Sequence, residues 1–80
     1  MNDAEVLERI NHLAHEEHTL FEQEAHGTVS EADRERLRKL QVMLDQCFDL
    51  LRQRRAKREF GLDPDRATAR DPKTVEGYQQ

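Results

Sequence analysis

Little in this sequence is typical of a secreted, membrane or redox protein. It has no tryptophan, and its aromatic residues make up only 5% of the chain. A single cysteine, Cys47, has no partner for an internal disulfide, which is typical of a reducing compartment. No apolar run approaches the roughly 18 residues of a membrane span, and the start MNDAEVLERI lacks the features of a signal peptide. We therefore expect a cytoplasmic protein with no membrane association.

Glycine and proline are also scarce, with three and two residues, and residues 30–60 contain neither. Early in the chain, apolar residues recur at steps of three, four and seven, which is the spacing of one helix face. Capping by Asn2 or Asp3 and termination at Gly27 predict a helix over about residues 3–26. The apolar residues of this helix are Val6, Leu7, Ile10, Leu13, Ala14, Leu20 and Phe21.

A second apolar series alternates steps of three and four, as in the seam of a coiled coil. Ser30 is a suitable N-cap, and Gly61 followed by Pro64 ends the pattern, so we expect a helix over about residues 31–60. Residues 27–29 allow only a turn between antiparallel neighbours. The series comprises Leu37, Leu40, Met43, Leu44, Cys47, Phe48, Leu50 and Leu51.

Folding the chain at this turn places apolar residues opposite each other at four levels. The same register brings Asp3 close to Arg54 and leaves roughly two turns of the second helix beyond the first. The predicted fold is therefore all-α, an antiparallel, coiled-coil-like two-helix hairpin over residues 1–62. The facing pairs are Leu20 with Leu37, Leu13 with Leu44, Ile10 with Cys47, and Val6 with Leu51.

Residues 63–80 contain both prolines and little apolar content before Val75 and Tyr78, so we expect an extended, flexible tail. A lone hairpin of this size is only marginally stable. The apolar stripe is also wider than a two-helix seam, which favours a homodimer in the form of a four-helix bundle. The additional stripe residues are Leu7, Ala14, Phe21, Met43 and Leu50.

Charge is unevenly distributed along this chain of net charge −4. Residues 1–26 hold seven acidic residues and one basic residue, whereas the run RQRRAKR at 52–58 holds five basic residues and no acidic one. Such a run either complements the helix dipole and the acidic start of the first helix, or docks a partner. The candidate partner-binding residues are Arg54, Arg55, Lys57 and Arg58, with Tyr78 in the tail.

No residue pattern predicts catalysis, a bound cofactor or a metal site. His12, His15 and His18 recur at every third residue, so their rings fan out around the helix, whereas helical zinc pairs are spaced i,i+4. The seam position of Cys47 predicts burial, and a reactive thiol needs exposure and a cationic neighbour. We therefore expect a protein that is not an enzyme.

The segment CFDLLRQRRAKREFGLDPD, with the terminal VEGYQQ and the earlier Glu16-Glu17-His18, resembles domain of unknown function family 2630. The resemblance covers nearly the whole chain, with Phe48 at a position where tryptophan is expected. The family consists of short bacterial proteins with no assigned activity, cofactor or partner. The resemblance therefore supports the hairpin and adds no function.

These features favour a non-enzymatic protein-interaction module, in which the basic end of the second helix or the tail docks onto a protein partner. The alternative is an accessory protein that contacts nucleic acid through residues 52–58. The negative net charge disfavours this alternative, because it repels nucleic acid at long range.

Overall fold

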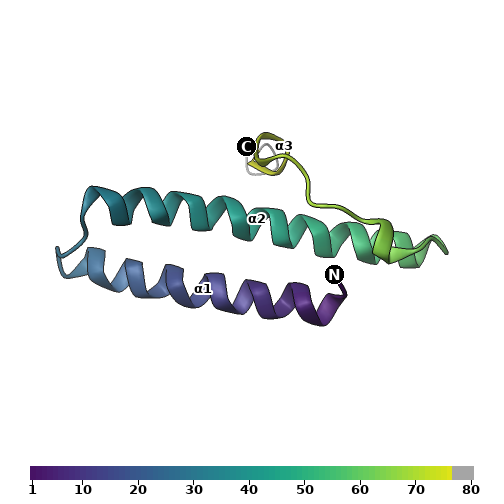
Figure 1. Ribbon diagram of the computed structural model, residues 1–80, viewed down its shortest axis with the longest axis horizontal. Helices are drawn as coiled ribbons and strands as arrows, with labels where there is room; N and C mark the ends of the chain where they lie inside the picture. The colour runs from purple at the N-terminus through teal and green to yellow at the C-terminus, as the bar shows by residue number, and fades with distance from the viewer. Residues whose placement is uncertain (77–80) are drawn as a thin grey trace.

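Two long antiparallel helices and a short segment that folds back along the second helix (residues 62–76, the returning segment) make up the computed structural model, which describes residues 1–76 (Figure 1). Helix α1 runs over Asp3–Ala25 and α2 over Glu31–Glu59. They are followed by a 3-10 turn, η1 (Pro64–Arg66), and a short helix, α3 (Pro72–Glu76). Residues 1–76 contain no strand. The predicted all-α hairpin is confirmed, and each long helix ends one residue before its predicted end.

Both long helices begin with a capping box. The Asn2 side chain accepts a hydrogen bond from the Glu5 backbone N–H at 2.8 Å, and the Glu5 carboxylate accepts one from the Asn2 N–H at 3.0 Å. Ser30 and Asp33 repeat this exchange at the start of α2. Each box satisfies two backbone donors that a helix N-terminus otherwise leaves free, which fixes where the helix starts.

Both helices also end in the same glycine-dependent way. Gly27 and Gly61 adopt positive φ angles of 73° and 72°. The backbone N–H of Thr28 then donates to the Gln23 carbonyl at 3.0 Å, and that of Leu62 donates to the Lys57 carbonyl at 2.7 Å. These are Schellman motifs, and a glycine lacks the Cβ that would make this conformation unfavourable.

The core lies along the predicted seam between α1 and α2. Leu51, Met43 and Leu50 pack against it and are half-buried. An ion pair between Arg36 and Glu16 closes one flank of the seam, with Nη2 and Oε1 3.1 Å apart. The residues predicted to form the facing pairs are therefore all in the core, except Leu51, which is only half-buried at its edge. The buried residues are Val6, Ile10, Leu13, Leu20, Leu37, Leu40, Leu44 and Cys47.

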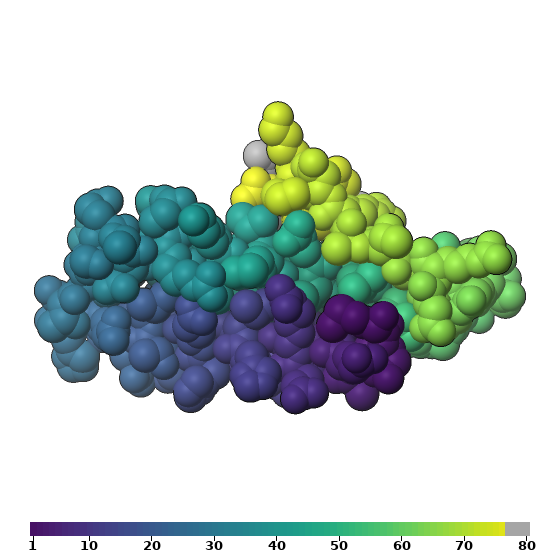
Figure 2. All heavy atoms as spheres, in the orientation of Figure 1, coloured from purple at the N-terminus to yellow at the C-terminus, as the bar shows by residue number. Residues whose placement is uncertain are grey.

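The segment after α2 folds back along that helix, on the side away from α1 (Figures 1 and 2). Over this part the structure differs from the expected extended tail. Asp63 accepts a hydrogen bond from the Asp65 N–H at 2.9 Å and starts η1. Asp71 accepts one from the Lys73 N–H at 2.7 Å at the start of α3, where Val75 is 1% exposed. Local caps and one buried side chain thus order a segment of low apolar content.

Helix α2 is the common packing surface of the fold. Among the described elements, α1, η1 and α3 each pack against α2, and α1 packs against neither of the other two. None of the helices in residues 1–76 combines the length and apolarity that crossing a membrane requires.

Candidate functional site

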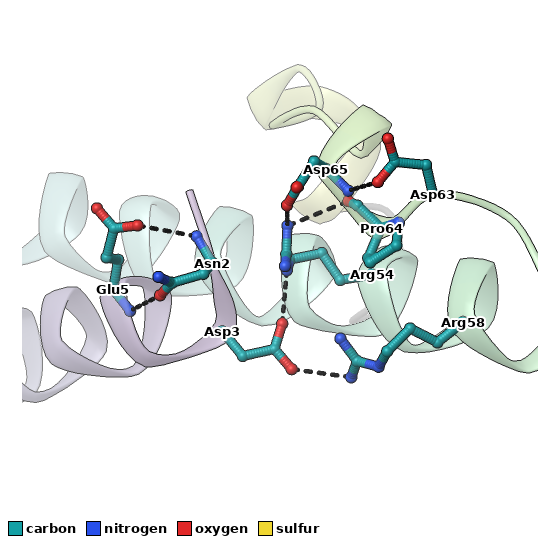
Figure 3. Close-up of polar contacts among 8 residues, drawn as sticks. All are labelled: Asn2, Asp3, Glu5, Arg54, Arg58, Asp63, Pro64 and Asp65. Atoms are coloured by element: carbon teal, nitrogen blue, oxygen red, sulfur yellow. Dashed lines mark hydrogen bonds and ion pairs between the residues drawn. The ribbon is translucent and has the colours of Figure 1, made fainter.

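Arg54 lies at the centre of a polar cluster that joins three parts of the chain (Figure 3). Its Nε donates to Asp3 Oδ1 at 2.5 Å, and its Nη1 donates to Asp65 Oδ1 at 3.0 Å and to the Pro64 carbonyl at 3.1 Å. The side chain is 6% exposed. Arg54 therefore holds the start of α1 and η1 against α2, and its charge does not face solvent.

Asp3 binds a second arginine from the next turn of α2. Its Oδ2 lies 2.8 Å from Arg58 Nη2 (Figure 3). The hydrogen bonds from Arg58 and Arg54 lower the pKa of Asp3, because both favour the carboxylate. The carboxylates of Asp3 and Asp65 in turn raise the pKa of Arg54. The predicted proximity of Asp3 and Arg54 is confirmed.

Beyond this cluster, α2 continues past the start of α1 (Figure 1). The five residues from Arg55 to Glu59 extend it by about 7.5 Å at 1.5 Å per residue. This is less than the two turns expected from the sequence, and Arg58 within it still reaches Asp3. Arg55 pairs with Glu59 at 3.1 Å on the same helix and remains 78% exposed.

Two apolar side chains follow the basic residues at this end. Phe60 is 79% exposed and Leu62 is 58% exposed. We name the overhanging end as the surface made by Arg55, Lys57, Arg58, Phe60 and Leu62. Of the predicted partner-binding residues, Arg55 and Arg58 are exposed at this end, Lys57 is half-buried there, and Arg54 is buried in the fold, while Tyr78 lies outside the described residues.

A buried carboxylate, Asp49, was not singled out by sequence reasoning. It is 2% exposed, accepts a hydrogen bond from Gln53 at 2.8 Å, and lies 3.4 Å from the Arg70 Nε. The returning segment also accepts hydrogen bonds from Gln46 and Gln53 through backbone carbonyls. An open cavity of about 470 Å³ adjoins these residues, lined by Asp49, Arg52, Gln53, Ala56 and Arg70. The sequence position of Asp49 gave no sign of its burial, because its partner Arg70 comes from the segment that was expected to be an extended tail.

The histidines and the cysteine occupy unremarkable positions. His18 lies 3.0 Å from Glu22, and both side chains are well exposed. In residues 1–76, no group of three or more histidine, cysteine or carboxylate side chains is close enough to hold a metal ion. Cys47 is buried in the seam, as its position predicts.

Apolar side chains outside the core divide between two flanks of the hairpin. Met43 and Leu50, expected from sequence to widen an exposed stripe, are half-buried and line a cavity of about 240 Å³ together with Ala69. Leu7, Phe21 and Phe48 remain 51%, 45% and 46% exposed. The returning segment thus shields one flank and leaves the other open.

Comparison with known proteins points to one family. The family model described as "Protein of unknown function (DUF2630)" matches residues 2–80. Uncharacterised proteins from Mycobacterium bovis and Mycobacterium tuberculosis are 48% identical over 77 residues, which cover 95% of this chain and 88% of each relative. No solved structure matches the chain. Because the family model spans almost every residue and the relatives align over nearly their full length, this protein belongs to the DUF2630 family of bacterial-type proteins of unknown function.

Proposed function

We propose that this protein is a non-enzymatic, cytoplasmic interaction module that binds an acidic protein segment through the overhanging end of α2. The observation that carries the proposal is the 79% exposure of Phe60, which follows Arg55, Lys57 and Arg58 closely in the chain. An exposed aromatic ring that closely follows a run of cations in the chain fits a partner that presents an apolar side chain together with carboxylates. Aromatic residues and arginines are also the residues that most often dominate binding energy in protein interfaces.

The overhanging end is held in one conformation before any partner binds. The hydrogen bond from Leu62 N–H to the Lys57 carbonyl fixes the chain direction after Gly61. Arg54, one turn earlier, ties α2 to both Asp3 and Asp65. A surface that is already ordered loses less conformational entropy on binding, which favours its use as a docking site.

A protein partner is favoured over nucleic acid by the small number of aromatic rings at this end. Arg58 contacts Asp3 and Arg55 contacts Glu59, so any anionic partner, whether it presents phosphates or carboxylates, would compete with these pairs. Phe60 is also the only aromatic residue of the overhanging end. A base-stacking platform usually presents several rings, so sequence-independent binding of single strands is disfavoured.

The proposal of a non-enzymatic role rests on how the buried polar groups are used. Catalysis requires a nucleophile, base or acid held close to a space that a substrate can enter. Asp49 borders the 470 Å³ cavity, but it already pairs with Gln53 and with Arg70 from the returning segment. These contacts favour a role for Asp49 in holding that segment.

The test begins with capture of binding proteins by the tagged protein in its own host, followed by identification and purification of the captured protein. Calorimetry then compares the wild type with the double variant Arg55→Glu/Phe60→Ser. We expect the double variant to remain helical and to bind about tenfold more weakly or worse, because charge reversal adds repulsion and the aromatic anchor is lost. Lys39→Glu is the matched control, because Lys39 is also an exposed cation on α2 and lies outside the overhanging end.

A second arm separates the two classes of partner. Short DNA and RNA duplexes and single strands are titrated at two salt concentrations, because phosphate binding weakens steeply with salt. Tight, salt-sensitive binding of a nucleic acid that is lost in Arg55→Glu/Phe60→Ser would replace the protein partner with the alternative. Unchanged affinity of the double variant for the captured protein would remove the overhanging end from the function altogether.

A further inference from the structure

Helix α1 carries a second stripe of residues with the same alternation of three and four as its core seam. We call it the outer stripe, and each of its members follows a seam position by one residue. All of its members are exposed and none carries a formal charge with histidine neutral, although residues 1–26 hold seven acidic residues. The outer stripe consists of Ala4, Leu7, Asn11, Ala14, His18, Phe21 and Ala25.

A heptad-type stripe without charges is the pattern of a helix that packs against another helix. The exposed face of a solvated helix is ordinarily polar, and α1 places all of its carboxylates off this stripe. Among the described elements α1 packs only against α2, through the core seam. The outer stripe is therefore a second packing face that no part of residues 1–76 covers.

The corresponding positions of α2 lie on the same flank of the hairpin. In an antiparallel pair, residues that directly follow a seam position in the sequence lie on one flank of the hairpin, whichever helix they belong to. Residues that directly precede a seam position lie on the other flank. Glu16 directly precedes the seam position Glu17, and Arg36 directly precedes the seam residue Leu37. The ion pair between Glu16 and Arg36 therefore marks the second of these two flanks. Gln46 and Gln53, which bind the returning segment, belong to that flank too. The returning segment thus occupies one flank, and the outer stripe belongs to the opposite one, the open flank.

On the open flank the two helices differ in charge. Helix α2 contributes Phe48 and four arginines, whereas the outer stripe of α1 is neutral and is bordered by Glu8 and Glu22. The α2 positions are Arg34, Arg38, Gln41, Asp45, Phe48, Arg52 and Arg55. Arg34, Arg38 and Arg55 form exposed pairs within α2, and such pairs rearrange at little energetic cost.

We propose that the open flank binds a second copy of this chain, forming an antiparallel four-helix bundle in which α1 of each copy lies against α2 of the other. A two-fold axis parallel to the helices produces this arrangement and keeps every neighbouring pair antiparallel. The acid-bordered outer stripe then meets the arginine-rich helix in both halves of the interface. The other two-fold arrangement would place α1 on α1 and the four arginines of α2 on their own copies, which like-charge repulsion opposes.

The size of the flank is sufficient for a specific dimer. The 23 residues of α1 extend about 35 Å, and two adjacent helices are about 20 Å wide. Each copy would therefore bury on the order of 600–700 Å², or about 1,300 Å² in total, which is within the range of specific interfaces. Leu7 and Phe48 lie at neighbouring levels of the register and would form an apolar layer with the same two residues of the second copy.

The first test measures the mass of the protein in solution by light scattering at micromolar concentrations. The wild type should have twice the 9.5 kDa mass of the chain, and Leu7→Lys should have 9.5 kDa. Leu62→Lys is the matched control, since Leu62 is similarly exposed (58% against 51%) and lies outside the open flank, so this variant should remain dimeric. Circular dichroism verifies that all three are folded. A folded wild type at 9.5 kDa, or a dimeric Leu7→Lys, would refute the proposal.

The second test determines which helices face each other. Differently tagged Ala14→Cys and Gln41→Cys variants are mixed and treated with a short bismaleimide, with the wild type controlling for the buried Cys47. Cross-links should join the two variants, and neither variant should cross-link to itself. Self-cross-linking of Ala14→Cys alone would show α1 against α1 and contradict the proposed arrangement. Leu7 and Phe60 each belong to only one of the two surfaces, whereas Arg55 belongs to both. Leu7→Lys should therefore retain partner binding and Phe60→Ser should remain dimeric, so the two proposals fail independently.

Discussion

Arg54 and Arg55 are adjacent in sequence, yet their side chains have opposite environments. Arg54 is 6% exposed and meets two carboxylates and a carbonyl, whereas Arg55 is 78% exposed and meets one carboxylate on its own helix. A buried cation is tolerated only when its donors are paired, so the contacts of Arg54 are required by its burial. The basic run therefore divides into residues that hold the fold and residues that face solvent.

This difference predicts unequal effects on stability. Arg54→Ala should lower the melting temperature by roughly 5–10 °C, because it removes three charge-assisted hydrogen bonds in a chain of this size. Arg55→Ala is the control and should shift it by about 2 °C at most, since exposed pairs contribute little. Thermal unfolding followed by circular dichroism makes the comparison. Equal shifts would contradict a structural role for Arg54.

A pH dependence follows from the lowered pKa of Asp3. A carboxyl group whose pKa is lower in the folded state stabilises that state above its unfolded value, here 3.8, and loses this contribution as pH falls through the folded pKa. The wild type should therefore be more stable than Asp3→Asn at neutral pH, and the two melting temperatures should converge as pH falls below 3.8. Glu5→Gln is unsuitable as a control because Glu5 caps α1; Glu8→Gln, on an exposed position, should show no such convergence. A constant difference between wild type and Asp3→Asn across this range would contradict the inference.

At the scale of the elements, the seam between α1 and α2 provides the main apolar packing. Leu44 lies in the middle of α2 and is 7% exposed. Leu44→Ala should lower the free energy of unfolding by about 2–5 kcal/mol, because it removes buried methyl groups and leaves a cavity. Urea denaturation measures the loss, and Leu62→Ala at an exposed site is the control. A change smaller than that of the control would show that the seam is not the core.

Helix α3 is too short to be stable without its contact with α2. Val75 is its buried residue, at 1% exposure. Val75→Asp should therefore abolish the hydrogen-exchange protection of the amides of residues 74 and 75, which donate to the Asp71 carbonyl, while leaving the protection of α1 nearly unchanged, since α1 does not pack on α3. Thr74→Asp, at an exposed position, should leave both regions protected. Loss of protection throughout the chain in Val75→Asp would show that the returning segment is needed for the hairpin.

The hairpin was predictable because its signals are periodic and local. Leu37, Leu40 and Leu44 repeat at helical spacing, and Gly27 and Gly61 stop each helix where the pattern ends. The returning segment was not predicted, although Asp63-Pro64 and Asp71-Pro72 are recognisable helix starts. Its attachment depends on Gln46, Gln53 and Asp49 binding groups 15 to 24 residues away, and no spacing rule relates such positions.

The candidate site was predictable only in part. The basic run identified Arg55, Lys57 and Arg58, but a row of similar residues does not indicate which side chain turns inward. The burial of Arg54 depends on Asp3 and Asp65, from opposite ends of the chain, meeting at one point of α2. The open flank had a visible signal in the spacing of Leu7, Ala14 and Phe21, and the structure adds that the opposite flank is occupied.

At the scale of the whole molecule, charge is separated between the helices. Residues 1–26 hold seven acidic residues and one basic residue, whereas α2 holds nine basic and six acidic ones.

If two copies associate as proposed, unfolding is linked to dissociation, and the melting temperature should rise with protein concentration. Leu7→Lys should show no such dependence. A melting temperature of the wild type that is independent of concentration would count against the dimer.

Because α1 and α3 both pack on α2 but not on each other, their contributions to stability should be thermodynamically additive. In a double-mutant cycle, Leu13→Ala and Val75→Ala should combine with an interaction energy below about 0.5 kcal/mol, as expected for sites without shared contacts. Arg54 is the exception, because it bonds to Asp3 at the start of α1 and to Asp65 in η1. A cycle between Asp3→Ala and Asp65→Ala should therefore be non-additive, and the deviation should disappear once Arg54 is replaced. A ligand that displaces the returning segment would then be sensed at the start of α1 through this one guanidinium group.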